Sequence, residues 1–144
     1  ALAYCINTIT KSMGAADFLL GVCESWMTPA LFLSVAFIAG SVISFFTGSS
    51  WGTFAICIPI AVPMAYSFTG GQLGTLVYAA VGAVVSGGLF GDHCSPVSDT
   101  TVLSSLGAAC DHIDHVRTQL PYALLAAAVS IILWIVVALV GGAV

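Results

Sequence analysis

Residues 30–68 decide the fold, and they read ALFLSVAFIAGSVISFFTGSSWGTFAICIPIAVPMAYSF. As one helix they would be roughly 58 Å long, almost twice the roughly 30 Å hydrocarbon thickness of a bilayer. The helix must therefore break, and we expect the break in the segment TGSSWGT at 47–53, which has two glycines and four hydroxyls. Apolar sequence resumes at Phe54 and continues to about Phe68.

The rest of the chain is similarly apolar. Of its 144 residues, 60% are apolar and 6% are charged, against about 25% charged in a soluble domain. No Asp, Glu, Lys or Arg lies between Ser25 and Gly91, and none follows Arg117. A water-soluble surface cannot be built from so few charges, so lipid is the expected solvent. We predict an all-α integral membrane protein, a single transmembrane domain over 1–144 with about four or five transmembrane or part-crossing helices, some of them discontinuous.

Charge and cysteine content exclude other classes of protein. The formal net charge of −4, from six acids and two bases, argues against a nucleic-acid partner. The five cysteines include no Cys-x-x-Cys pair, so no disulfide framework is expected. Cys5, Cys23 and Cys57 are interpreted as small buried hydrophobes. No basic segment followed by an apolar core and a cleavage site opens the sequence, so no signal peptide is expected.

Apolar runs and short polar stretches alternate on both sides of residues 30–68. Residues 1–29 mix both kinds and fit either a truncated membrane helix with an interfacial segment or a helix pair near the headgroups. The other segments are a turn at 69–72, an apolar run at 73–91, a polar motif at 92–101, a short apolar piece at 102–110, a polar stretch at 111–119 and a final span at 120–140. The spacing of Gly87 and Gly91 is interpreted as helix packing.

The polar motif DHCSPVSDTT at 92–101 is the second interruption of apolar sequence. Pro96 removes a backbone donor and excludes a regular helix through the motif. Inside a bilayer, non-helical backbone is tolerated only where it is buried in protein or lines an aqueous cavity. Secondary transporters use such discontinuous helices to bind a coupling ion. The alternative is that both interruptions are ordinary loops outside the membrane.

Asp92 and Asp99 are the main candidates for chemistry, because an intramembrane acid costs at least about 2.5–3.5 kcal/mol on insertion scales. Hydroxyls accompany them, namely Ser95, Ser98, Thr100 and Thr101 in the same motif and Thr47, Ser49 and Ser50 in the first interruption. Such hard oxygen ligands suit Na⁺. A carboxylate partly removed from water has a raised pKa, so it can exchange a proton for a cation near neutral pH. The alternative is that the two carboxylates lie at helix ends, with Asp99 starting the next piece.

Several other polar residues have weaker or competing interpretations. His93 is expected either to tune or relay protons or only to donate a hydrogen bond. A solvated interfacial face is expected, with pH sensing as the alternative, for Asp111, His112, Asp114, His115 and Arg117. A zinc site would use Cys94, Cys110, His112 and His115, whose spacing fits no standard pattern. The pattern Gly-x-Ser-x-Gly at 48–52 leaves an intramembrane serine hydrolase on Ser50 as an alternative, although that motif has meaning only at a strand-to-helix turn.

The two interruptions resemble a known family. TGSSWGT at 47–53, followed by GDHCSPVSDTT at 91–101, resembles the two signature segments of the NhaC-type sodium/proton antiporter family, and CDHIDHVRTQLPY at 110–122 is similar to the stretch that follows there. The resemblance covers about residues 40–125. It implies a multi-pass transporter of the inner cell membrane that exchanges Na⁺ for H⁺, in some members with an organic anion or amino acid. It implies no cofactor beyond the transported ions.

The resemblance also implies a site and a partner. Asp92, Ser95, Ser98 and Asp99 would fall in the ion pathway, and the chain would resemble the C-terminal part, about half, of a larger secondary transporter. Since transporters bind their ions between repeats, we expect a homo-oligomer or a missing N-terminal half in the lipid bilayer. The leading hypothesis is a Na⁺/H⁺ antiporter in which Asp92 and Asp99 alternate between the two ions. Its rivals are a Na⁺-coupled exchanger of an organic anion or amino acid, the serine hydrolase and a structural membrane subunit.

Overall fold

The computed structural model describes residues 8–9, 12–14, 18, 21–22 and 27–141. This part of the chain contains helices and no strand, which confirms the predicted all-α class. The helices are α3 (Pro29–Thr47), α4 (Ser50–Phe68), α5 (Thr75–Cys94), α6 (Asp99–Gly107) and α7 (His112–Gly141). Cys5, Cys23 and most of residues 1–29 lie outside the described residues.

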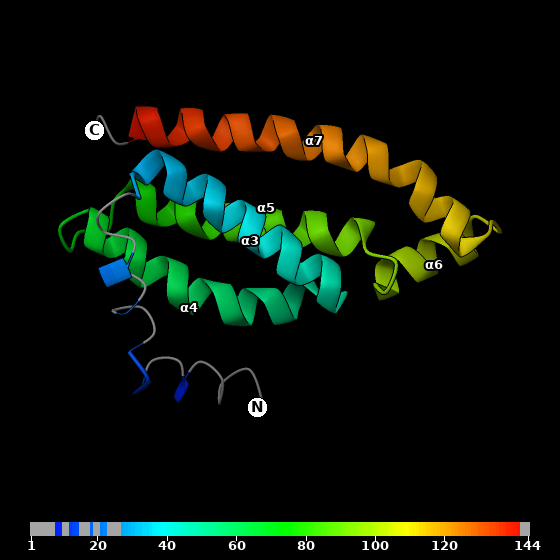
Figure 1. The fold of residues 1–144 in the computed structure, drawn as a ribbon, viewed down its shortest axis with the longest axis horizontal. Helices are drawn as coiled ribbons and strands as arrows, with labels where there is room; N and C mark the ends of the chain where they lie inside the picture. The colour runs from blue at the N-terminus through cyan, green and yellow to red at the C-terminus, as the bar shows by residue number, and fades with distance from the viewer. Residues whose placement is uncertain (1–7, 10–11, 15–17, 19–20, 23–26, 142–144) are drawn as a thin grey trace.

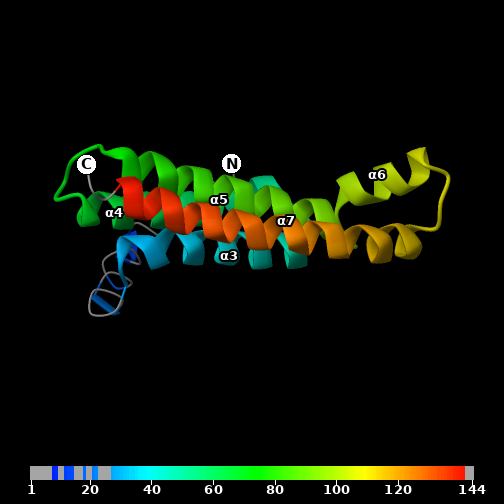
Figure 2. The same cartoon turned by 90° about the horizontal axis from the view of Figure 1, so that it is seen from above.

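The chain runs back and forth along one long axis (Figure 1). Helices α3 and α4 form an antiparallel hairpin, and α5 returns beside α3, against which it packs most extensively. Helix α6 lies beyond the end of α5, and α7 runs back past α6 and α5 (Figure 2). The bundle therefore has a packed part, built from α3, α4, α5 and most of α7, and a projecting part built from α6 and the start of α7.

The first predicted break is confirmed between α3 and α4. Gly48 ends α3 with a φ of 65°, and its N–H donates to the carbonyl oxygen of Ser44 at 2.8 Å. This left-handed conformation is inexpensive only for glycine. Ser49 then caps α4, because its Oγ accepts the N–H of Gly52 at 3.3 Å. The chain thus reverses direction over two residues.

The second predicted break is confirmed between α5 and α6, at residues 95–98. Pro96 lies inside this segment, where it can donate no backbone hydrogen bond. Ser98 caps the next helix by accepting the N–H of Thr100 at 3.2 Å. Asp99 is the first residue of α6, where the helix dipole favours a negative charge. The element α5–α6 is therefore a discontinuous helix, with a short second half.

Small residues bring α3 and α5 together. A Cβ at Gly87 would overlap the backbone of Phe37, and one at Gly91 would overlap the backbone of Ser41. Ser44 adds a hydrogen bond across the same interface, from its Oγ to the carbonyl oxygen of Gly88 at 2.6 Å. The interpretation of the Gly87–Gly91 spacing as helix packing is confirmed.

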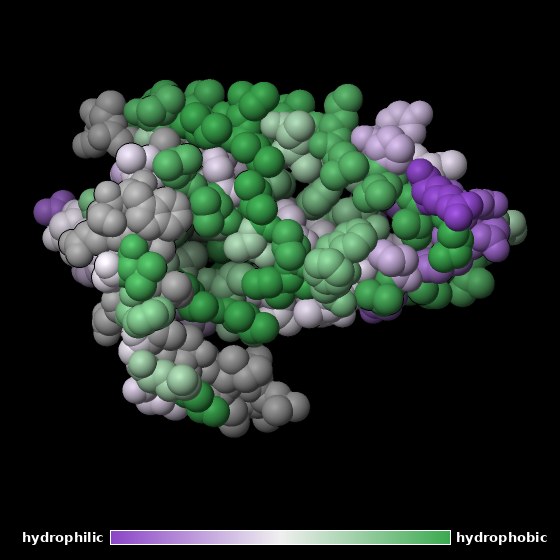
Figure 3. Space-filling model, viewed as in Figure 1, coloured by the Kyte–Doolittle hydropathy of each residue, from purple (hydrophilic) through white to green (hydrophobic). Residues whose placement is uncertain are grey.

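Three helices, α4, α5 and α7, have the length and apolar composition to cross a membrane, and α3 adds the shorter apolar segment Leu31–Thr47. Apolar side chains cover most of the face in Figure 3, and polar ones gather where α6 meets α7. The polar stretch and the final span, predicted as separate segments, form one helix, because α7 continues through Pro121. With the short helix α6, the five helices α3 to α7 match the predicted all-α architecture of about four or five helices.

Candidate functional site

The two breaks lie against each other in space. A Cβ at Gly48 would stand 2.8 Å from the carbonyl oxygen of Val97 in the second break. Ser95 Oγ donates to the carbonyl oxygen of Phe45, in the last turn of α3, at 2.6 Å. The tip of the α3–α4 hairpin therefore supports the non-helical backbone of residues 95–98.

Asp92 is the buried acid at this junction. Among the charged side chains that the structure describes it alone is buried, with 7% of its surface exposed. It lies in the last turn of α5, and Ser98 reaches back across the break to donate from its Oγ to Oδ1 of Asp92 at 2.7 Å. The break thus brings a hydroxyl donor to the carboxylate of Asp92, which is buried at the end of α5.

The number of available protons determines which hydroxyl donates to which around Ser98. An ionised Asp92 only accepts, so the single hydroxyl proton of Ser98 points to it. Thr100 Oγ1, 2.7 Å from Ser98 Oγ, must then donate its own proton to Ser98, and the N–H of Thr100 donates to the same oxygen. Ser98 is therefore saturated. The lone pairs left for a cation are those of Thr100 Oγ1 and of the remaining Asp92 oxygen, and that oxygen can also take a proton while Oδ1 still accepts the hydroxyl of Ser98.

Asp92 borders a cavity of about 420 Å³ between α5 and α7. The lining residues are Phe37, Ser86, Leu89, Phe90, Asp92, His93, Thr100, Ala123, Ala126, Ala127 and Ser130. The wall from α7, Ala123 to Ser130, belongs to the apolar run that begins at Leu120. The cavity therefore lies alongside the span, not beyond its end. Its described lining contains no Lys or Arg.

The hydroxyls of the second motif divide into two groups. Thr100 lines the cavity and Ser98 bonds to Asp92, as described above. Ser95 and Thr101 are buried and donate instead to backbone carbonyl oxygens, of Phe45 and of His93 at 3.1 Å. These two bonds hold the break in shape. The side chain of His93 itself is exposed and lines the cavity.

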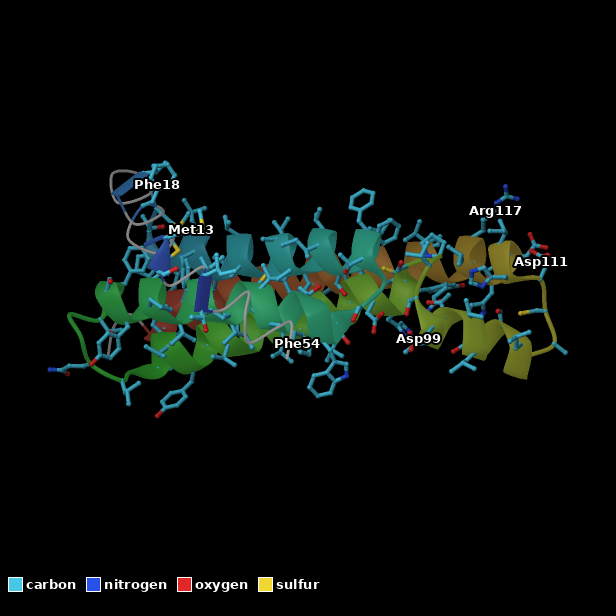
Figure 4. The ribbon with its side chains drawn as sticks, turned by 90° about the horizontal axis from the view of Figure 1, so that it is seen from below. Met13, Phe18, Phe54, Asp99, Asp111 and Arg117 are labelled. Atoms are coloured by element: carbon cyan, nitrogen blue, oxygen red, sulfur yellow. The ribbon has the colours of Figure 1, made fainter. Side chains whose placement is uncertain are left out.

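The two acids predicted to act together occupy different environments. Asp99 is exposed at the start of α6 and is not among the residues that line the cavity (Figure 4). It begins the piece that follows the break, as the helix-end alternative has it, with Ser98 as the capping residue. The structure therefore joins Asp92, but not Asp99, to the cavity.

The hydroxyls of the first break stay local. Thr47 Oγ1 donates to the carbonyl oxygen of Ile43 at 2.8 Å, Ser49 caps α4, and Ser50 is buried in the first turn of α4. None of the three lines the Asp92 cavity. The Gly-x-Ser-x-Gly pattern at 48–52 joins two helices, whereas the hydrolase motif joins a strand to a helix.

Two serines that the sequence did not single out line the cavity. Ser86 of α5 and Ser130 of α7 face it, and Ser86 Oγ also accepts the indole N–H of Trp134 at 3.2 Å. The sequence signal for them is that each interrupts an apolar run. The periodicity of these runs does not predict which face of each helix packs against its neighbour, so the signal could not place the two serines at the cavity.

The polar stretch before the span contains two kinds of residue. Asp111, Asp114 and Arg117 are exposed, and Figure 4 shows Asp111 and Arg117 projecting at the α6–α7 end, as expected for a solvated face. His112 instead turns toward the second break and α6. Within the described ranges no three His, Cys, Asp or Glu side chains gather as metal ligands, and Cys94 bonds to the carbonyl oxygen of Phe90.

Comparison with known families gives the chain its relatives. The model of the Na⁺/H⁺ antiporter family matches residues 1–139. The chain belongs to this family. The resemblance carried by the two breaks is thus confirmed, and this antiporter-family chain, with its apolar helices, is a multi-pass membrane protein.

The curated relatives of this chain are named for several different exchange activities. The chain is 37% identical, over 79% of its length, to 23% of the malate-2H⁺/Na⁺-lactate antiporter of Bacillus subtilis. It is 32% identical, over 88% of its length, to 25% of the arginine/ornithine antiporter ArcD of Halobacterium salinarum. It is 30% identical, over 95% of its length, to 29% of the Na⁺/H⁺ antiporter NhaC of Alkalihalophilus pseudofirmus. The chain thus spans about a quarter of these relatives, and no solved structure matches it.

Proposed function

We propose that this chain carries the ion site of a Na⁺/H⁺ exchanger of the inner cell membrane, and that Asp92 binds Na⁺ and a proton in turn. The observation that supports it is the buried Asp92 carboxylate, bonded to Ser98 and open to a cavity beside the span of α7. An unneutralised carboxylate is costly in such surroundings. A proton and a cation each neutralise it, and each excludes the other.

The ligands for Na⁺ follow from the lone pairs that remain free. The second oxygen of Asp92 and Thr100 Oγ1 provide two, and Ser86 and Ser130 add hydroxyls on the cavity wall. Water completes the shell. His93, on the same wall, has the chemistry to relay the displaced proton. Asp99, exposed one residue beyond Ser98, is an outer carboxylate that raises the local cation concentration.

The chain acts within a larger assembly in this proposal. It spans about a quarter of its relatives, whose names describe whole antiporters. Transporters place their ion sites where repeats meet. The Asp92 cavity would be closed by further helices of a longer transporter or by another copy of this chain.

An organic solute coupled to Na⁺ is the second candidate, and the size of the cavity favours it. A volume of about 420 Å³ lies in the range of small-molecule sites and exceeds the needs of one ion. Relatives named for malate, lactate, arginine and ornithine exchange are consistent with this candidate. The described lining, however, offers an acid and no basic side chain, so from this chain alone it suits a cation or an amine better than an organic anion.

Exchange is tested in everted membrane vesicles that hold an imposed pH gradient. Addition of Na⁺ should collapse the gradient in vesicles containing this chain, and Asp92→Asn should abolish the collapse because the amide binds neither ion by charge. Asp99→Asn is the matched control and should keep most of the activity. If the collapse is lost in Asp99→Asn and kept in Asp92→Asn, the assignment of the site to Asp92 is wrong. A collapse driven by an amino acid but not by Na⁺ alone would favour the second candidate.

A further inference from the structure

One imidazole ring connects three elements around the second break. His112 is the first residue of α7 and is half-buried. Its Nε2 lies 2.8 Å from the carbonyl oxygen of Pro96, inside the break, and its Nδ1 lies 3.2 Å from Ser105 Oγ on α6. The ring therefore fixes the backbone of the break to both helices that follow it.

The partners of His112 determine which nitrogens carry protons. The carbonyl oxygen of Pro96 only accepts, so Nε2 must donate. A neutral ring with its proton on Nε2 makes this bond, and Ser105 Oγ, 3.2 Å from Nδ1 and 2.8 Å from the carbonyl oxygen of Val102, donates its proton to either of them. The bond from His112 to Pro96 therefore needs only the Nε2 proton.

We propose that His112 is a positioning residue for the Asp92 site: its ring fixes the break, which keeps Ser98 on the carboxylate of Asp92. Ser98 lies two residues beyond Pro96, so a shift of the Pro96 carbonyl carries Ser98 with it. Removal of the ring takes the donor away from the Pro96 carbonyl oxygen and releases the segment. The effect on transport rests on the proposed function, but the fixed state of the break does not.

Hydrogen exchange of the backbone amides at 97–102 tests the fixed state without any transport. After correction for intrinsic exchange, protection should be about tenfold lower in His112→Ala than in the wild type, the effect of losing one hydrogen bond. His115→Ala, one turn along the same helix, is the matched control and should keep the wild-type protection. Equal protection in His112→Ala and the wild type would overturn the proposal.

A second variant separates positioning by the imidazole donor from simple structural support. In His112→Gln the side-chain amide can donate to the Pro96 carbonyl oxygen in place of Nε2, so protection at 97–102 should be regained in part. If His112→Gln and His112→Ala show the same low protection, the proposal is overturned. In vesicles, His112→Ala should raise the Na⁺ concentration for half-maximal exchange, and His112→Gln should lower it again toward the wild-type value. An unchanged Na⁺ dependence would remove His112 from the function of the site, while loss of exchange in every variant, His115→Ala included, would instead contradict the proposed function.

Discussion

The two breaks look alike in sequence and differ in what their hydroxyls do. In the α3–α4 turn, Thr47, Ser49 and Thr53 bond to groups three or four residues away, as caps and helix backbonds. In the α5–α6 break, two side chains reach further: Ser95 bonds to Phe45 of α3, and Ser98, besides capping α6, bonds to Asp92 on the other side of the break. Only the second break holds a buried acid.

The difference shows how a turn is distinguished from a site. Local bonds satisfy the backbone groups that a helix end leaves unpaired, and they need no other part of the chain. Bonds between distant segments fix one segment relative to another, which is what a binding site requires. On this view the first break supports the second, through the contact of Gly48 with Val97.

Replacing Gly48 should give the largest effect on stability. Gly48→Ala places a side chain in the left-handed region, at about 1–2 kcal/mol, and against the Val97 backbone, at about another 1–3 kcal/mol. Gly70→Ala is the matched control, because Gly70 has a φ of 64° and open space around it. Unfolding in detergent should show Gly48→Ala as the less stable of the two. Equal losses would mean that the breaks do not support each other.

Replacing the two capping serines should give the next largest difference, in the Na⁺ dependence of exchange. Ser98→Ala removes the hydroxyl that stabilises the charged carboxylate of Asp92 and holds it in place, so the Na⁺ concentration for half-maximal exchange should rise by about tenfold or more. Ser49→Ala loses only a cap, about 1 kcal/mol of stability, with the Na⁺ dependence unchanged. Exchange assays and unfolding curves measure the pair. A similar Na⁺ dependence in both variants would remove the distinction between the breaks.

Much of the fold follows from the sequence because its signals are local. The length of residues 30–68 requires a break, and the glycine at 48 and the proline at 96 place both breaks correctly. Gly87 and Gly91 predict close packing, since only small residues permit it. The merging of the polar stretch with the final span was missed, because Pro121 and a change of polarity read as a boundary although the helix continues through both.

The site follows less completely because it depends on contacts between segments. Asp92 and Asp99 are equivalent by composition, and only the direction of the chain through the break buries one and exposes the other. The bond from Ser98 to Asp92 and the inward turn of His112 come from the same geometry. Ser86 and Ser130 face the cavity through the packing of α5 on α7. The ion-binding role of every one of these residues stays a prediction.

The central claim is that Na⁺ and a proton compete for Asp92, and proton release from the purified protein tests it most directly. Addition of Na⁺ in weak buffer should release protons, and the Na⁺ concentration for half-maximal release should rise as the pH falls, by up to about tenfold for each pH unit. Asp92→Asn should release none, and Asp99→Asn should still release protons, at a somewhat higher Na⁺ concentration than the wild type. Release that persists in Asp92→Asn, or Na⁺ binding that does not depend on pH, would contradict the account.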